Sequence, residues 1–155
     1  MDHGVQAAEL FLQGYNCAQA VVVAFCDVTG LEPKLAARLS SSFGGGVGRM
    51  REICGAVSGM AAVLGLLYGY DSMHDDQTKQ AHYARVQELA QQFRAQFGSI
   101  VCRELLENPS TDPTPSPRTQ KYYQERPCAG YVHLAGELLD AYIEAHPLEN
   151  VPCEN

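Results

Sequence analysis

Residues 53–70 read ICGAVSGMAAVLGLLYGY, an uncharged run of 18 residues that is long enough to form a membrane-spanning helix. Half of these residues, however, are Gly, Ala, Ser or Cys, so the hydrophobicity of the run is modest. The chain has no second run of this kind, and no basic cluster flanks this one. We therefore expect a buried helix in a bundle rather than a membrane span.

The expected helix begins near Met50 and ends at about Tyr68, where Gly69 follows. Directly before it, residues 44–48 read GGGVG, and four glycines in five positions disfavour regular structure. A glycine-rich segment ahead of a helix resembles a phosphate-binding loop, but the preceding strand and the lysine of a P-loop are missing. We interpret the segment as a flexible turn that permits close packing.

Apolar residues at helical spacing, together with capping residues, predict further helices on both sides of this run. The expected segments are 2–13, 17–28, 34–43, 76–97, 100–107 and 127–145. The first two segments could also form one kinked helix, and the state of residues 119–125 is open. The sequence thus predicts an all-α fold: a single domain over residues 1–155, with about six helices around a central apolar, Gly/Ala-rich helix.

Two segments are expected to lie outside the helices. Residues 108–117 read NPSTDPTPSP, and four prolines in ten residues predict a surface loop. The terminal segment, residues 146–155, is expected to fray.

The composition restricts the class of function. The net charge is −7 and the basic residues are scattered, which argues against a nucleic-acid or anionic-membrane partner. The N-terminal residues MDHGVQAAEL lack the features of a secretory signal, so we expect a cytoplasmic protein. In a reducing compartment, the six cysteines are expected to serve as thiols, catalytic pairs or metal ligands.

Four of the six cysteines lie near the expected start of a helix: Cys17, Cys54, Cys102 and Cys128. Unpaired N–H groups and the positive end of the helix dipole stabilise a thiolate there and lower the pKa of the thiol. Thiolate is the form that attacks disulfides and binds metals. The other two cysteines, Cys26 near the end of a predicted helix and Cys153 in the tail, are expected to have no role in function.

Cys54 is the expected nucleophile, because Arg49 and Arg51 lie within five residues of it and can add positive potential. Downstream of it, the predicted helix carries two stripes. Small residues, which let a helix or a cofactor come close, form one stripe: Ser58, Ala62, Gly65 and Gly69. Bulky core residues form the other: Ile53, Val57, Met60, Leu64 and Leu67.

The cysteine spacing matches no local motif. There is no CxxC pair, and the intervals of 37, 48 and 26 residues fit no compact metal site. A shared site therefore has to be assembled by the fold, and buried cysteines that only fill space are the alternative. Among the histidines, His133 is the one to consider as a ligand, because it lies five residues after Cys128.

The residues around these cysteines also resemble a known family. The segment CGAVSG (54–59) matches a CGAxxG motif, and NCAQAV (16–21), FGSIVCRELL (97–106) and Cys128 before an apolar helix match in the same order. From about Gly14 to Ala145, the chain resembles the C_GCAxxG_C_C family of redox-active proteins of bacteria and archaea. The resemblance implies functional roles for Cys17, Cys54, Cys102 and Cys128 and for the motif glycines, Gly55 and Gly59.

This family is also similar to a domain of split-Soret cytochromes, which bear haem and have been associated with an iron–sulfur centre. The similarity implies that the four cysteines could hold an iron–sulfur cluster or another thiolate-bound metal. The chain has no CxxCH sequence, so covalent c-type haem is not expected.

Three hypotheses for the function follow. The first is a thiol-based redox protein, an oxidoreductase in which two of the four cysteines cycle between dithiol and disulfide with an unknown redox partner. The second is a metal or iron–sulfur protein in which all four thiolates meet at one centre. The third is a non-catalytic binding module in which the small-residue stripe is a docking groove, for example for a second copy in a homodimer.

Overall fold

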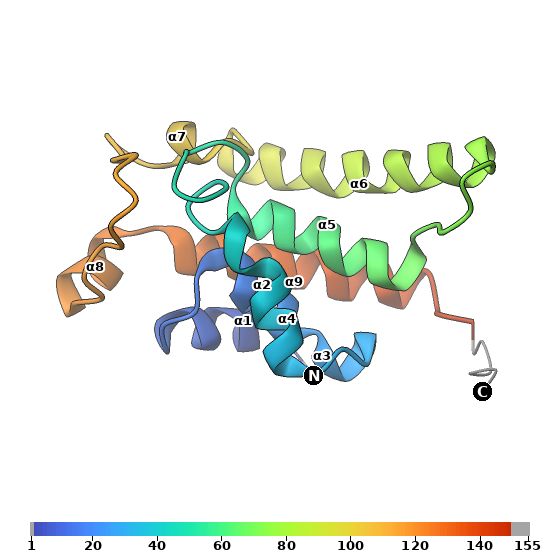
Figure 1. Cartoon of the computed structure of the whole chain (residues 1–155), viewed down its shortest axis with the longest axis horizontal. Coiled ribbons are helices and arrows are strands. Elements are labelled where there is room, and N and C mark those ends of the chain that lie inside the picture. The colour runs from blue at the N-terminus through green and yellow to red at the C-terminus, as the bar shows by residue number, and fades with distance from the viewer. Residues whose placement is uncertain (1, 150–155) are drawn as a thin grey trace.

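The computed structural model describes residues 2–149, and over this range the chain is helical, without a regular strand (Figure 1). The elements are α1 His3–Leu12, α2 Cys17–Ala24, α3 Cys26–Thr29, α4 Pro33–Ser40, the 3-10 turn η1 Ser41–Phe43, α5 Gly55–Tyr68, α6 Asp76–Phe97, α7 Cys102–Leu105, α8 Gln120–Glu125 and α9 Cys128–Ala145. The all-α prediction is confirmed.

Within residues 2–149 there are nine α-helices, so the expectation of about six is too low. The helix expected over 17–28 is divided into α2 and α3 at Phe25, whose backbone leaves the helical region with φ −96° and ψ 14°. Phe25 is fully buried, and its ring stacks on that of His3. Residues 120–125, whose state the sequence left open, form α8, capped by the Thr119 side chain.

Most helix starts follow from local capping. The Asn16 side chain accepts a hydrogen bond from the Gln19 N–H, and the Gln19 side chain accepts one from the Asn16 N–H, a reciprocal capping box at the start of α2. The Asp75 carboxylate likewise caps α6. At the other end of α6, Gly98 adopts a left-handed φ of 86°, which favours glycine.

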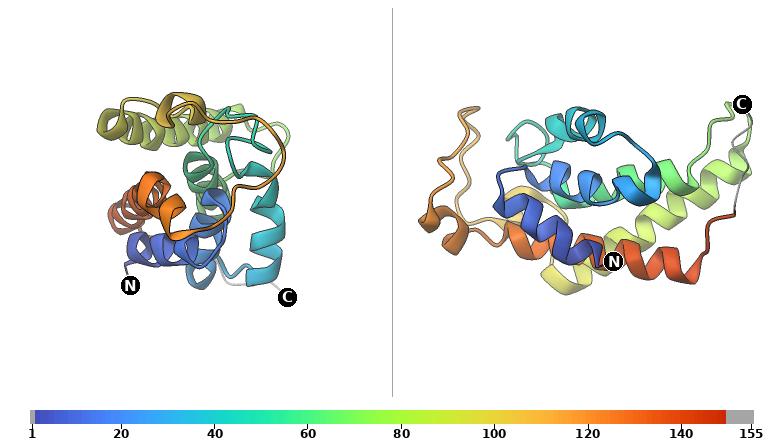
Figure 2. Two further views of the ribbon diagram at one scale, coloured as in Figure 1. Left: turned by 90° about the vertical axis from the view of Figure 1, so that its left-hand side faces the viewer. Right: turned by 90° about the horizontal axis from the view of Figure 1, so that it is seen from below.

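The longer helices form a layered bundle. α1 packs along α9, and α2 contacts α1, α4, α5 and α9. α6 runs over α5 and α9 on the far side from α1 (Figures 1 and 2). α1 and α9 come together closely at Gly4 and Gly136, where a Cβ on Gly136 would lie 2.6 Å from the Gly4 Cα. This packing buries one continuous apolar core.

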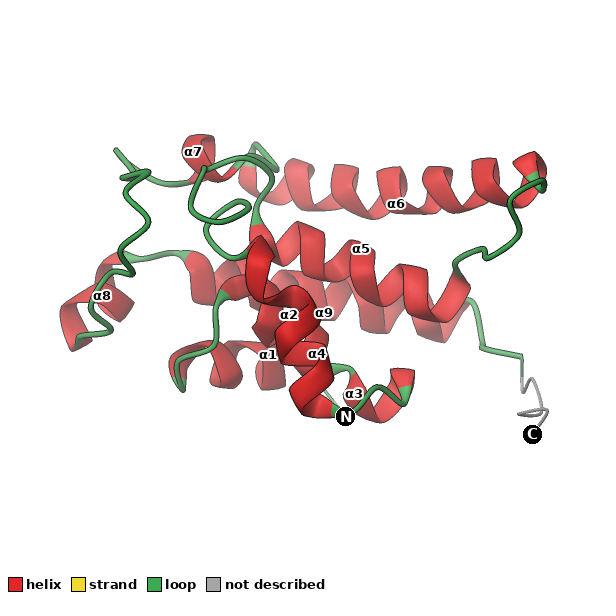
Figure 3. Cartoon of the chain, in the orientation of Figure 1, coloured by secondary structure: helices red, strands yellow, loops and turns green. Residues whose placement is uncertain are grey.

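The helix expected from Met50 begins five residues later, at Gly55. The segment before it is a loop in which three non-glycine residues have positive φ: Val47 and Arg49 at 63° and Arg51 at 61°. Left-handed backbone costs about 1–2 kcal/mol for such residues, so tertiary contacts must hold the loop in place. Figure 3 shows this loop and the irregular segment after α7 at the same end of the molecule.

The two stripes of α5 differ in part from expectation. Ile53 precedes the helix and is 38% exposed, so it does not belong to the core, whereas Met60 and Leu64 are buried as predicted. A Cβ on Gly65 would meet nothing within 4 Å, so no helix approaches the small-residue stripe at this position. The helix that does come close is α2, which packs against Gly55 and Gly59 instead.

None of the helices in the described part of the chain is both long and apolar enough to cross a membrane. α5, which contains most of the uncharged run, has only 14 residues.

Candidate functional site

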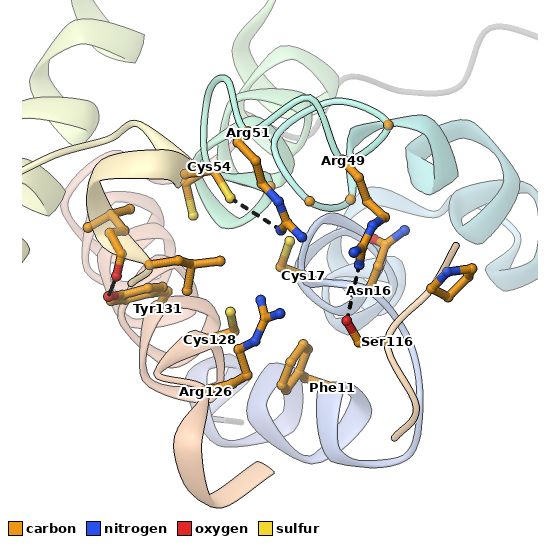
Figure 4. Close-up of a pocket in the computed structure, with 18 of the residues that line it drawn as sticks. Phe11, Asn16, Cys17, Arg49, Arg51, Cys54, Ser116, Arg126, Cys128 and Tyr131 are labelled. Carbon is orange, nitrogen blue, oxygen red and sulfur yellow. Dashed lines mark hydrogen bonds between the residues drawn. The ribbon is translucent and has the colours of Figure 1, made fainter. Parts of the chain in front are cut away.

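The loop end of the bundle contains a pocket of about 450 Å³. All four cysteines that the sequence singled out line it: Cys17, Cys54, Cys102 and Cys128. Figure 4 labels Cys17, Cys54 and Cys128 around the cavity. They come from the starts of α2, α5, α7 and α9, which are far apart in the sequence. The described cysteines are free thiols. Tertiary packing therefore assembles one thiol site from four separate segments.

Cys54 and Cys102 are brought together by a short antiparallel pairing that the sequence analysis missed. Ile53 and Val101 form an isolated β-bridge. The Cys54 N–H donates to the Ile100 carbonyl at 2.8 Å, and the Cys102 N–H donates to the Glu52 carbonyl at 2.6 Å. The paired stretch is too short for its apolar/polar alternation to reveal it in sequence.

Cys17 and Cys54 meet because α2 and α5 begin side by side. Cys17 is the first residue of α2, and Cys54 is the N-cap of α5. The Cys17 sulfur lies where a side chain on Gly55 would be, and that same Cβ would be 2.8 Å from the Phe43 carbonyl oxygen. A Cβ on Gly59 would lie 2.9 Å from the Ala18 carbonyl oxygen. These two glycines therefore act through helix packing, which seats Cys17 against the start of α5.

Cys128 is the first residue of α9 and follows Pro127 as predicted. One turn later, the Tyr131 hydroxyl donates a hydrogen bond of 2.9 Å to the Leu105 carbonyl. This bond ties α9 to α7 and completes the wall of the pocket between Cys128 and Cys102.

The expected lowering of the thiol pKa values is wrong for three of the four cysteines. Burial raises the pKa of Cys17, raises that of Cys54 well above its ordinary value of 9.0, and raises that of Cys128 to about 12. The helix starts do supply N–H groups, from Ala56 and Val57 to Cys54, and these act to lower its pKa. Removal from water outweighs this stabilisation, because it disfavours the charged form.

The thiols also act on one another. A charge on Cys17 raises the pKa of Cys54 and of Cys128, and a charge on Cys102 raises that of Cys17. Cys17 is thus within electrostatic range of the other three thiols. It is also only partly buried, as is Cys128, whereas Cys54 and Cys102 are 5% and 7% exposed.

The two arginines expected to act on Cys54 have other partners. Arg51 donates from Nη1 to the Cys102 sulfur at 3.7 Å and from Nε to the Ser110 carbonyl at 2.8 Å. Arg49 donates from Nε to the Asp112 carbonyl at 2.7 Å and from Nη1 to the Ser116 hydroxyl at 3.3 Å. Both residues line the pocket, and their guanidinium groups donate to α7 and to the segment after it.

The proline-rich residues 108–117 contain no helix or strand, and they form part of the pocket wall. Pro113, Pro115 and Ser116 line the cavity, and the bonds from Arg49 and Arg51 hold the segment across it. The loop expected at the surface is therefore also part of the candidate site.

Two further arginines line the pocket, and the sequence analysis did not select them: Arg118 and Arg126. The Arg118 guanidinium lies over the Phe11 and Tyr122 rings, 4.8 Å from each ring centre, and that of Arg126 lies 5.2 Å from Tyr122. A possible signal was present in the sequence, because RTQKYYQERPC places both arginines within ten residues of Cys128.

The remaining candidates lie elsewhere. Cys26 opens the short helix α3 rather than ending a longer one, and its thiol donates to the Val22 carbonyl, outside the pocket. His133 pairs with Glu137 at 3.4 Å and does not line the pocket. Cys153 and most of the tail expected to fray lie outside the described residues.

The chemistry of the donor set, four thiols around one cavity, would suit a thiolate-bound metal or an iron–sulfur cluster. Their placement does not. Across residues 2–149, no group of three or more Cys, His, Asp or Glu side chains is close enough together to hold a metal ion. The side chains as positioned therefore do not fit such a centre.

The fold and the pocket place this protein in the class of helical domains that bring cysteines from separate segments together at one site. The chain belongs to the family described as "Putative redox-active protein (C_GCAxxG_C_C)", whose model matches residues 15–142. This match confirms the resemblance found in the sequence. The chain matches no curated protein and no solved structure.

Proposed function

We propose that this protein is a thiol–disulfide redox protein whose reaction takes place in the four-cysteine pocket. The observation that supports this proposal is the convergence of four family-defining thiols on one cavity that a small molecule can enter. Thiols placed only to fill the core would not need a cavity beside them.

Cys17 is the best candidate for the attacking thiol. It is more exposed than Cys54, and the Gly45 and Ala18 N–H groups act to lower its pKa, although burial still raises the pKa overall. Cys54, the nucleophile expected from the sequence, is 5% exposed and is better placed to act second. The contact of the Cys17 sulfur with Gly55, the neighbour of Cys54, makes these two thiols the proposed pair.

The reaction would run in two exchanges. The Cys17 thiolate attacks one sulfur of a substrate disulfide, forms a mixed disulfide and expels the other sulfur as a thiolate. The Cys54 thiolate then attacks the Cys17 sulfur, forms the Cys17–Cys54 disulfide and expels the second substrate thiolate. The two protons lost by the cysteines end on the released thiols, so the protein is oxidised by two electrons and the substrate is reduced.

The test uses the reduced, full-length protein and an excess of 2-hydroxyethyl disulfide, followed by alkylation of the remaining thiols and peptide mass spectrometry. The wild type should form an internal Cys17–Cys54 disulfide. Cys54→Ser should stop at a mixed disulfide on Cys17, and Cys17→Ser should not react in the pocket. Cys26→Ser, which removes a thiol outside the pocket, should behave as the wild type.

Either of two results would overturn the proposal. The first is that all four pocket thiols survive the disulfide unchanged. The second is a stoichiometric amount of iron or zinc, found by metal analysis after anaerobic purification, which would favour a four-thiolate metal centre instead.

A further inference from the structure

The pocket carries an unusual charge for this chain. Four arginines line it, and no Asp, Glu or Lys does, although the protein has a net charge of −7. Within residues 2–149, none of these four arginines forms a salt bridge; their hydrogen bonds go to backbone carbonyls, a hydroxyl and a sulfur. No carboxylate of residues 2–149 therefore pairs directly with the positive charges in the pocket.

Arg51 shows this most clearly. Arg51 is 3% exposed, and its Nη2 atom has no hydrogen-bond partner in the described part of the chain. Leaving a buried charged donor without an acceptor is costly, so Arg51 Nη2 is available to donate to an acceptor group of a ligand. In Figure 4 the Arg51 guanidinium extends into the pocket, and that of Arg126 reaches towards the same space from the opposite side.

The arginines are close enough for their positive charges to repel one another. Burial and the positive charges of Arg51 and Arg126 lower the pKa of Arg49. The carboxylate that acts on Arg49 belongs to Asp112, which is exposed and accepts a hydrogen bond from the Thr114 N–H. An anion bound among Arg49, Arg51 and Arg126 would relieve this repulsion.

The other residues that line the pocket and the volume of the cavity indicate the size and polarity of the ligand. Phe11, Leu106, Pro113 and Tyr122 provide apolar surface around the thiols. The volume of about 450 Å³ lies within the range of about 300–1,000 Å³ that is typical of small-molecule pockets. The cavity thus suits a short organic molecule with apolar segments between charged ends.

We propose that the pocket is a binding site for a small carboxylate-bearing disulfide, with its carboxylate held by Arg51 and Arg126 and its sulfur atoms beside Cys17. A planar guanidinium fits a carboxylate through two parallel hydrogen bonds, which would also orient the disulfide for attack. The identity of the reacting group rests on the proposed thiol–disulfide function, whereas the anion site stands on the arginines alone.

The first arm of the test measures anion binding without redox chemistry. Suberate has the chain length of 3,3′-dithiodipropionate but no sulfur, and 1,8-octanediol is its neutral counterpart. By titration calorimetry with the reduced protein, suberate should bind at least about tenfold more tightly than the diol. Equal binding of the two, or no binding of suberate, would overturn the anion site whatever the thiols do.

Variants locate the site. Arg126→Gln should weaken suberate binding about tenfold and leave octanediol binding unchanged. Arg126 is the safer variant, since its side chain makes a cation–π contact with Tyr122 rather than holding the loop; Arg51→Gln is the second. Arg103→Gln is the matched control, because Arg103 is an exposed arginine beside Cys102 that pairs with Glu52 and does not line the pocket. Loss of binding in Arg103→Gln as large as in Arg126→Gln would contradict the assignment.

The second arm measures the rate at which the protein thiols react with three disulfides of similar length. Dianionic 3,3′-dithiodipropionate should react about tenfold faster than neutral 2-hydroxyethyl disulfide, and cationic cystamine should be slowest. If suberate binds as expected but no disulfide oxidises the thiols, the anion site stands and the thiol–disulfide function is wrong. If the dianion reacts no faster than cystamine, the assignment of the substrate class is wrong.

Discussion

At the scale of single residues, burial determines the protonation of three of the four pocket thiols. A helix start favours a thiolate, and this local effect can be read from sequence. The cysteines that line the pocket also lie against the core, where removal from water raises the pKa values of Cys17, Cys54 and Cys128. At neutral pH these three thiols are therefore expected to be mostly protonated, so the proposed exchange would use the small fraction of Cys17 that is present as thiolate.

A pH dependence of stability follows. Between about pH 9 and 12, Cys128 loses its proton in the unfolded chain but keeps it in the native protein. The unfolded state then binds fewer protons, so the free energy of unfolding falls as the pH rises through this window, while below pH 9 the contribution of this thiol is fully present. Urea unfolding at a series of pH values should show a shallower decline in Cys128→Ser than in the wild type.

Cys26→Ser is the control for this experiment. Cys26 lies outside the pocket, and its substitution should change the decline less than that of Cys128. An identical pH dependence in Cys128→Ser and the wild type would show that burial does not raise the pKa of this thiol.

At the scale of elements, the contact between α2 and α5 sets the distance between two of the thiols. Gly55→Ala should destabilise the protein by about 1–3 kcal/mol, because the new Cβ would overlap the Cys17 sulfur and lie 2.8 Å from the Phe43 carbonyl oxygen. The free energy of unfolding from urea titration measures the effect. The same variant should also slow formation of the Cys17–Cys54 disulfide, because α2 must move away.

Gly65→Ala provides the matched control on the same helix. A Cβ at Gly65 would meet nothing within 4 Å, so this change should stabilise the protein by about 0.5–1 kcal/mol through lower backbone entropy in the unfolded chain. If the two alanine variants have similar stabilities, the close approach at Gly55 does not matter to the fold.

At the scale of the whole molecule, a buried histidine connects the first and the last of the described helices. The His3 ring is bonded through Nδ1 to Asp140 at 2.5 Å and through Nε2 to Asp27 at 3.1 Å. The His3 N–H also donates to Asp140 at 2.9 Å. His3 is 6% exposed, and these contacts connect α1, α3 and α9. His3, Asp27 and Asp140 do not line the pocket themselves, but α1 and α9 contribute Phe11, Cys128 and Tyr131 to its wall.

Asp140→Ala should therefore lower the free energy of unfolding by about 1–3 kcal/mol, because it leaves buried donors of His3 without an acceptor. Glu137→Ala, which removes the exposed partner of His133 one turn earlier on α9, should change stability by less than about 1 kcal/mol. Equal effects of the two substitutions, measured by thermal and urea unfolding, would contradict a structural role for the His3 cluster.

The elements that the sequence predicted well are those with local signals. α6 has the predicted bounds, because Asp75 and Gly98 stop it at both ends, and Asn16 marks the start of α2. The start of α5 was missed because its loop depends on left-handed residues, Val47, Arg49 and Arg51, which no local preference supports. The bridge from Ile53 to Val101 was missed because its two partners are far apart in the chain.

The sequence by itself determined the helical class, most helix bounds and the family, and it selected the four of the six cysteines that line the pocket. These properties depend on capping, periodicity and motifs, which act within a few residues of one another. Only the tertiary structure decided that the four thiols share a pocket, that burial raises three of their pKa values, and that Arg51 turns to Cys102, 51 residues away. Burial and such long-range contacts exist only once the helices have packed, and so no local pattern contains them.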